Sequence, residues 1–434
     1  MSGTYFMDAI HSRYILTEKS VPAVWSDAAK NATLEAAKAA GISPVTLIKE
    51  PEAAALYTIQ QLDAFLAPGD TIVVCDAGGG TVDLISYEID KVSPTLELRE
   101  IVPGTGDMVG SIALNRRFKT AVKELIPSDR WQKFKASRAM VRASQEFENH
   151  IKLDFSGDLK KEFYVDLPGA HLEDDPDKGL VGNEWKMTGS DVKAIFDPVI
   201  TDILRLIQHQ VQSVQCKGKD VRAIFLVGGF GGSEYLRKEV ERVHVGIKVA
   251  QLDDAWDSIA KGAALSKIPG HAVVASVSAV RHYGVQCGYL FDEVIDKGQS
   301  TYVNSFTGET RASRMNWHIN IGDNIKRDDK IRLQFQRQLP ENFTAGDAVF
   351  IEILYDCVDK VAPVHKSKSQ TIKENSLVSE RAGSLSETDA YQDSGEIYWE
   401  VNYDLVIRFD SAVMTFSMEL GGKTLGSVKA RFEQ

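Results

Sequence analysis

The run V-V-C-D-A-G-G-G-T-V-D at residues 73–83 constrains the fold of this chain more than any other feature. An apolar segment at residues 71–75 predicts a buried strand that ends in Asp76. Three glycines follow at residues 78–80, and a loop without Cβ atoms allows backbone N–H groups to close around an anion. A hairpin partner is expected at residues 82–89. The run is therefore either a phosphate-binding loop or a glycine-rich hairpin turn.

The polar side chains of this run favour the phosphate interpretation. Thr81 adds a hydroxyl donor for a phosphate oxygen. Asp76 and Asp83 provide two carboxylates, which are suited to hold a hydrated Mg²⁺. The alternative is a turn in which the aspartates cap the loop, and a short motif does not decide between the two.

Composition narrows the classes of protein to which this chain can belong. With 434 residues we expect two or three domains, and 43% apolar with 26% charged residues is ordinary for a soluble protein. A net charge of −11 argues against a nucleic-acid binder, and we expect no membrane span and no secretory signal. We interpret the widely spaced cysteines as buried thiols of a reducing, cytoplasmic compartment. They are Cys75, Cys216, Cys287 and Cys357.

The first 270 residues alternate between strand and helix patterns, which predicts a sheet covered by helices. Extended segments or strands are expected at residues 14–25, 45–48, 71–75, 82–89, 96–102, 162–167 and 221–227. Helices are expected from Asp27 to before Gly41, at residues 52–66, 111–124, 128–152 and 190–214, and from Ser233. Residues 168–184 are expected to form an acidic loop.

The composition changes after Gly270, where short alternating runs rich in β-branched and aromatic residues begin. We therefore expect two domains, residues 1–270 and a β-rich domain at residues 271–434. The polar stretch at residues 366–394 is expected to be a mobile loop. Strands are expected at residues 272–280, 283–291, 316–321, 331–336, 348–355, 397–409, 413–420 and 425–432.

Three further motifs accompany the glycine-rich run. Glu50 ends a strand before Pro51 opens an alanine-rich helix, so its carboxylate is expected in a ligand crevice, or else in solvent. A turn at residues 103–111 contains Gly110, which is placed to approach a phosphate or simply to form a loop. The loop L-V-G-G-F-G-G-S at residues 226–233 follows a buried strand, and it suits either a bound sugar or tight packing.

In this order the motifs resemble the nucleotide-binding domain of the 70-kilodalton heat-shock chaperone family, within the actin and sugar-kinase superfamily. The V-P-A segment at residues 21–23 and the following helix also match. The run E-P-E-A-A-A-L at residues 50–56 resembles the form in the divergent, twelve-type branch and its fungal relatives. The resemblance covers residues 17–268. It implies an actin-like ATPase (ribonuclease H-like) α/β fold, followed by a β-rich C-terminal domain.

The resemblance also implies a site for ATP or ADP with Mg²⁺. Asp76 and Asp83 would surround the metal through water, and Glu50 would lie beside the metal-bound waters. Asp76, Glu50 and Thr81 would be the catalytic residues, with Asp76 orienting the attacking water. The residues that contact the nucleotide would be Gly78, Gly79, Gly80, Thr81, Gly110, Gly228, Gly229, Glu148 and Lys152. For Glu148 and Lys152 the alternative is a solvated ion pair on one helix.

Departures from the family pattern concern the other half of the phosphate site. The family has an earlier phosphate loop and a lysine before its V-P-A segment, and neither is found in the 20 residues before Val21. The domain is therefore expected to be incomplete at its N-terminus. Gly232 stands where the family usually has an arginine, and residues 110–113 read G-S-I-A in place of G-x-E-D.

The C-terminal half follows the position of the family's substrate-binding domain, so client polypeptides and co-chaperones are the implied partners. The first hypothesis is an ATP-binding, chaperone-like protein with slow hydrolysis. The second is a pseudo-ATPase or interaction protein that keeps the fold without turnover. The third is a fragment of a longer chaperone-like ATPase, and a sugar kinase is less favoured.

Overall fold

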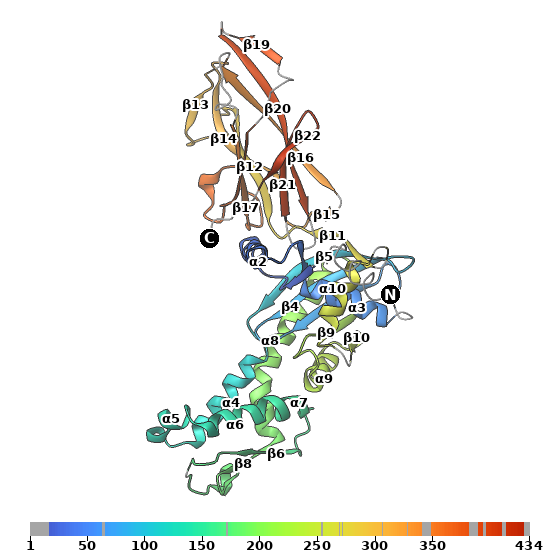
Figure 1. The fold of residues 1–434 in the computed structure, drawn as a ribbon, viewed down its shortest axis with the longest axis vertical. Helices are drawn as coiled ribbons and strands as arrows, with labels where there is room; N and C mark the ends of the chain where they lie inside the picture. The colour runs from blue at the N-terminus through green and yellow to red at the C-terminus, as the bar shows by residue number, and fades with distance from the viewer. Residues whose placement is uncertain are drawn as a thin grey trace, which may run out of the picture. The chain divides into compact units, whose positions relative to one another are not determined.

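The computed structural model groups the chain into two compact units (Figure 1). It describes residues 17–62, 66–170, 172–252, 255–268, 270, 272–305, 307–327, 329–340, 349–381, 389–393, 396–409 and 414–428. The first unit, here the α/β unit, contains Ser20–Val24 and Ile48–Val273. The second, the β-rich unit, contains Trp25–Leu47 and Val274–Gln434 together with the N-terminal segment Met1–Lys19. The domain limits at residue 270 stay a prediction.

The centre of the α/β unit is formed by the strands β10-β9-β3-β4-β5 of a seven-stranded sheet, in which β11 (Ala272–Ser278) and β15 (Asn324–Lys326) follow β5. β3 is parallel to β9 and antiparallel to β4, which in turn pairs antiparallel with β5. Every residue of β3 is buried, which explains the apolar run at residues 72–75 and places the carboxylate of Asp76 in a buried position at the end of the strand. The strands are β3 (Thr71–Ala77), β4 (Val82–Lys91), β5 (Leu96–Asp107), β9 (Val221–Val227) and β10 (Lys248–Gln251).

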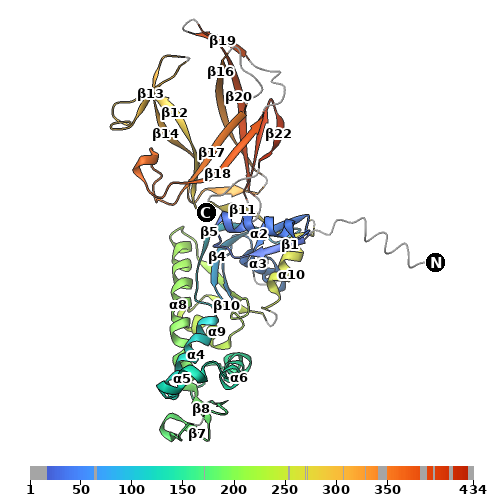
Figure 2. The same ribbon diagram turned by 60° about the vertical axis from the view of Figure 1, so that its left-hand side comes forward.

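Helices cover this sheet (Figure 2). The long helix α8 (Gly189–Gln215) begins with a capping box between Thr188 and Asp191 and packs on β3, β4, β5 and β9. α3 (Glu50–Gln61) also packs on β3, β4 and β9. α10 (Ser258–Ser266) lies against α3 so closely that a Cβ on Gly262 would overlap the backbone of Ala53. The unit further contains α4 (Ile112–Leu125) and α9 (Glu234–Val243).

Three expectations for this unit are wrong. The helix expected at residues 128–152 is divided, because Ser137 accepts from the Met140 N–H and begins a new helix. The acidic loop at residues 168–184 contains short elements, and the turn at residues 103–111 is strand as far as Asp107. The elements are α5 (Ser128–Phe134), α6 (Arg138–Glu146), a π-helix (Phe147–Ile151), α7 (Lys152–Asp154), β6 (Glu162–Asp166), a 3-10 turn (Pro176–Lys178), β7 (Leu180–Val181) and β8 (Glu184–Thr188).

The β-rich unit contains two antiparallel sheets, which confirms a β-rich C-terminal region. One has the order β13-β14-β12-β17-β18, and the other β16-β20-β21-β22 with β19 beside β20. Their strands are β12 (His282–Leu290), β13 (Thr301–Val303), β14 (Thr310–Ile319), β16 (Lys330–Pro340), β17 (Val349–Cys357), β18 (Lys373–Arg381), β19 (Asp389–Asp393), β20 (Glu396–Phe409), β21 (Met414–Leu420) and β22 (Lys423–Val428). The part of the strand expected at residues 425–432 that follows residue 428 lies outside the described residues.

The expectation of a mobile loop at residues 366–394 is wrong where strands form. β18 pairs with β17 from Lys373 to Arg381, and β19 pairs with β20. β18 is the last strand in its sheet, and an edge strand tolerates charged residues that a central strand would exclude. A 3-10 turn (Lys366–Lys368) precedes it.

The remaining elements are short. β1 (Thr17–Val21) pairs with β2 (Val45–Lys49), and α2 (Asp27–Ala39) begins at its cap Ser26. β11 (Ala272–Ser278) pairs with β15 (Asn324–Lys326). Cys75 and Cys357 are buried as expected, whereas Cys287 is half-buried and Cys216 is exposed at the C-cap of α8. Among the described helices, none combines the length and the apolar character that a membrane span requires.

Candidate functional site

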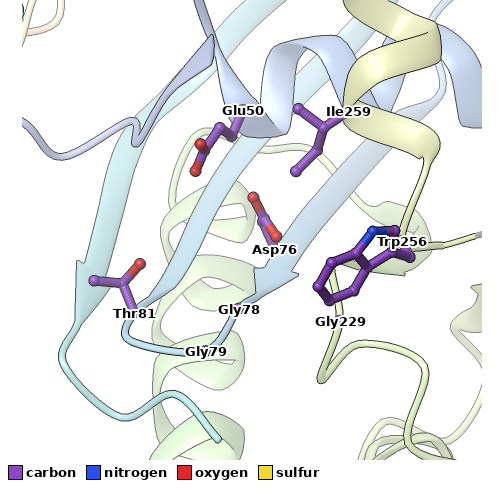
Figure 3. Close-up of a pocket in the computed structure, with 9 residues that line it drawn as sticks. Glu50, Asp76, Gly78, Gly79, Thr81, Gly229, Trp256 and Ile259 are labelled. Atoms are coloured by element: carbon purple, nitrogen blue, oxygen red, sulfur yellow. The ribbon is translucent and has the colours of Figure 1, made fainter. Parts of the chain in front are cut away.

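A cavity of about 210 Å³ opens at the end of β3, where the chain turns into β4 (Figure 3). Phosphate-loop glycines and two carboxylates form one part of its wall, and residues from the second glycine loop and α10 form the other. The lining residues are Glu50, Asp76, Gly78, Gly79, Thr81, Gly228, Gly229, Trp256 and Ile259. The structure therefore brings together most of the site residues expected from the sequence.

Three carboxylates meet at this end of the sheet. Asp76 and Asp83 are direct partners in the β3–β4 register, and each is at least 95% buried. Oδ1 of Asp83 accepts the Val24 N–H at 3.4 Å. Glu50 begins α3, because Pro51 suits the first helical turn, and its Oε1 accepts the Ser20 hydroxyl at 3.3 Å.

Burial, together with the smaller effect of the nearby charges of Glu50 and Asp83, raises the pKa of Asp76 to about 8. Burial also raises the pKa of Asp83, although hydrogen bonds from Thr81 and Val24 partly offset the effect. Crowded acidic groups of this kind fit a divalent cation, because Mg²⁺ prefers oxygen ligands and keeps several of its waters. No group of three His, Cys, Asp or Glu side chains in the described part of the chain is arranged as a metal site. Binding of Mg²⁺ through water at Asp76 and Asp83 stays a prediction.

The first glycine loop presents free donors. The Gly78 N–H donates to the Thr81 carbonyl at 2.9 Å and closes the turn. Gly79 and Gly80 are exposed, with open space where a Cβ would point. Within the described residues, no acceptor is found for the N–H groups of Gly79 and Gly80. Two unpaired N–H groups beside a threonine hydroxyl suit the oxygens of a phosphate.

Gly110 lies behind this loop and does not line the cavity. The N–H groups of Gly110, Ser111 and Ile112 donate to the carbonyls of Gly80, Gly78 and Gly79 at 2.9–3.2 Å. A Cβ on Gly110 would come within 2.5 Å of the Gly79 oxygen. In this structure the segment therefore supports the phosphate loop and does not offer these donors to a ligand.

The second glycine loop is fixed to the end of β3. The Phe230 and Gly231 N–H groups both donate to the Ala77 carbonyl, at 2.8 and 3.0 Å. Gly228 has a φ of +81°, and a Cβ there would overlap Oδ1 of Asp76. Glycine is therefore required at Gly228 for both its conformation and its closeness to the carboxylate.

Glu148 and Lys152 form an ion pair with each other, which was the alternative to contact with the nucleotide. Their charged groups lie 3.5 Å apart, and Asn115 hydrogen-bonds to both. They lie on and just after the π-helix, and neither lines the cavity. Their contact with an adenosine stays a prediction.

Two lining residues, Trp256 and Ile259, were missed by the sequence reasoning. They precede and begin α10, in the run A-W-D-S-I-A-K-G-A-A at residues 255–264. The available signal was a lone tryptophan in a polar turn before a helix of small residues.

The helix-covered sheet, with its hairpin loop and second glycine loop around one cavity, defines an α/β unit of the actin-like ATPase class, followed by a β-rich region. The family model described as Hsp70 protein matches residues 15–268, which is more than half of the chain. The chain belongs to the Hsp70 family.

Curated relatives agree with this assignment. The chaperone protein DnaK of Thermoplasma volcanium is 25% identical over 248 residues, covering 57% of this chain and 38% of that protein. DnaK of Elusimicrobium minutum is 27% identical over 249 residues, with the same coverage. Heat shock 70 kDa protein 12B of Homo sapiens is 27% identical over 237 residues, covering 49% of this chain and 34% of that protein. The matched region spans little more than a third of the length of these relatives.

Proposed function

We propose that the α/β unit binds MgATP and MgADP in the cavity at the end of β3 and hydrolyses ATP slowly. The observation that carries the proposal is the arrangement at the β3–β4 turn. There a buried carboxylate pair lies beside a loop with two unpaired N–H groups. Negative and positive binding groups are thus adjacent, as a metal-bound phosphate requires.

Each residue has a role in this proposal. The N–H groups of Gly79 and Gly80 bind phosphate oxygens, and Thr81 joins them when its hydroxyl turns from Asp83 to the ligand. Asp76 and Asp83 hold the metal through water, and Glu50 lies beside the metal-bound waters. Mg²⁺, when bound, neutralises charge on the phosphate oxygens.

Asp76 is also the carboxylate proposed to orient the attacking water, because it is the one of the buried pair that lines the cavity. Gly228 and Gly229 border the sugar side of the nucleotide. Gly110 acts by holding the phosphate loop in place, as its hydrogen bonds support.

The rest of the proposal follows the family. We propose domains at residues 1–270 and 271–434, membership of the twelve-type branch, a cytoplasmic location, and client polypeptides or co-chaperones as partners of the β-rich domain. A pseudo-ATPase that binds nucleotide without turnover is the second candidate. It is favoured by the sequence G-S-I-A at residues 110–113, which lacks the acid of the family's G-x-E-D segment.

Calorimetric titration with MgATP tests the proposal, and a turnover assay separates its two versions. We expect saturable binding at or below millimolar nucleotide, and slow phosphate release that falls clearly in Asp76→Ala. Absence of binding at millimolar MgATP would refute the proposal. Binding with equal, background-level turnover in both proteins would favour the pseudo-ATPase.

A further inference from the structure

Trp256 is exposed at a place where a ligand is expected. Its side chain lines the cavity and yet remains 78% exposed, although tryptophan is the largest apolar side chain. Figure 3 shows the indole on the Gly229 side of the cavity, across from Glu50 and Thr81. Glu50 and Thr81 therefore lie at one end of the cavity, Asp76 lies in the middle, and the flat aromatic surface lies at the other end.

The surrounding backbone holds this indole in position. The Gly228 N–H donates to the Ala255 carbonyl at 3.2 Å, and the Ser258 hydroxyl donates to the same oxygen at 2.7 Å. A Cβ on Gly229 would lie 2.7 Å from Cζ3 of Trp256, so the ring rests directly on the glycine backbone. The second glycine loop and the turn before α10 thus form one support for the ring.

We propose that Trp256 is the platform on which the base of the bound nucleotide stacks. The inference rests on the proposed function and adds the residue that recognises the nucleoside. With the phosphates at Gly79 and Thr81, the base extends toward the opposite end of the cavity, where Trp256 and Ile259 are the large side chains. An indole presents a broad π face, and aromatic stacking on one base is worth about a 5- to 150-fold change in affinity.

This arrangement should distinguish a nucleotide from a polyphosphate that lacks a base. Stacking needs a planar base, whereas the loop and the carboxylates need only phosphate and metal. Loss of the indole should therefore weaken nucleotide binding and leave the binding of magnesium tripolyphosphate unchanged. A role of Trp256 in merely supporting the loop would weaken both ligands together.

The test compares Trp256→Ala and Trp256→Phe with the unmodified full chain, using calorimetric titration of MgATP and magnesium tripolyphosphate. Trp131→Phe, in α5 and outside the cavity, is the matched control. We expect Trp256→Ala to bind MgATP at least about tenfold more weakly. Trp256→Phe should lose about threefold or less, and tripolyphosphate affinity should be equal in all four proteins. MgATP should quench tryptophan emission in the control and lose most of that effect in Trp256→Phe.

Each other result overturns the inference. Equal MgATP affinity in Trp256→Ala and the unmodified chain would exclude stacking and leave the nucleotide site intact. A parallel loss of tripolyphosphate affinity would show a structural role for the indole. Thermal unfolding of each variant identifies a folding defect. If Trp256→Ala is defective, the MgATP affinity and tryptophan emission of Trp256→Phe test the inference in its place. If the unmodified chain binds no MgATP, the proposed function fails first and the inference fails with it.

Discussion

The buried carboxylate of Asp76 is proposed to bind metal and nucleotide, and its burial lowers the stability of the metal-free protein. It is buried beside two other acidic groups, and this environment disfavours its charged form. Removing the charge should therefore stabilise the metal-free protein while it removes a group needed for MgATP. In Asp76→Asn we expect the free energy of unfolding in chelator to rise by roughly 1–2 kcal/mol. We expect MgATP affinity to fall at least about tenfold.

Urea unfolding in chelator and calorimetric titration with MgATP measure the two effects. Asp90→Asn, at the far end of β4 and half-buried, is the matched control and should change neither strongly. A variant that is less stable in chelator yet binds MgATP normally would contradict the assignment of Asp76.

His244 gives the α/β unit a pH dependence of its own. It follows α9, is 5% exposed, and its Nε2 has no hydrogen-bond partner among the described residues. Burial lowers its pKa below the ordinary 6.5. Between the two pKa values His244 binds more protons in the unfolded chain than in the folded one, so its own contribution to stability should fall as the pH drops below about 6.5, whereas the raised pKa of Asp76 acts in the opposite direction.

The expected slope is at most about 1.4 kcal/mol per pH unit. Urea unfolding at pH 7.5, 6 and 5 measures it. Relative to the unmodified chain, His244→Phe should gain stability as the pH falls from 7.5 to 5, whereas His209→Phe on the exposed face of α8 should not. Identical slopes in both variants would assign the pH dependence to other groups.

At the scale of elements, the contact between α10 and α3 positions one wall of the cavity. Gly262 is buried, and a Cβ there would overlap the Ala53 carbonyl. Gly262→Ala gains about 1 kcal/mol of helix propensity but must separate the two helices. We expect a net loss of roughly 1–2 kcal/mol in the free energy of unfolding. Weaker MgATP binding should accompany it, because Ile259 and Trp256 move with α10.

Chemical denaturation and MgATP titration test this prediction. Gly232→Ala is the control, since the nearest atom to an added Cβ there is 3.7 Å away. An unchanged or more stable Gly262→Ala would show that α10 can shift without consequence.

The elements that sequence predicts well are those whose pattern is local. Residues 72–75 of β3 are apolar because both faces of the strand are buried, and the following glycines mark the turn that the structure contains. The division of the helix at Ser137 and the strand at Lys373–Arg381 were missed for different reasons. In the helix, a single cap residue interrupts an otherwise helical pattern. In the strand, an edge position permits polar residues. Trp256 was missed because its partners, Gly229 and Asp76, are distant in sequence and meet only in the fold.

At the scale of the molecule, two large hydrophobic clusters of the described residues lie in different units. One core is built from β3, β9, α4 and α8, and the other from strands that follow residue 278. The cavity belongs entirely to the α/β unit. Nucleotide should therefore act on the stability of one unit only. The sequence indicates this division through its change in composition, although it does not assign residues 25–47 to the β-rich unit.

Differential scanning calorimetry should accordingly resolve two unfolding transitions, of which MgATP raises one. At a nucleotide concentration 100 times the dissociation constant, the binding unit should gain about 2.7 kcal/mol. Asp76→Asn should remove about half of this shift or more and leave the second transition in place. A single transition, or an equal shift of both, would show that the units unfold together. In that case a ligand bound at β3 would stabilise the strands of the β-rich unit as well, and the cores would not be energetically independent.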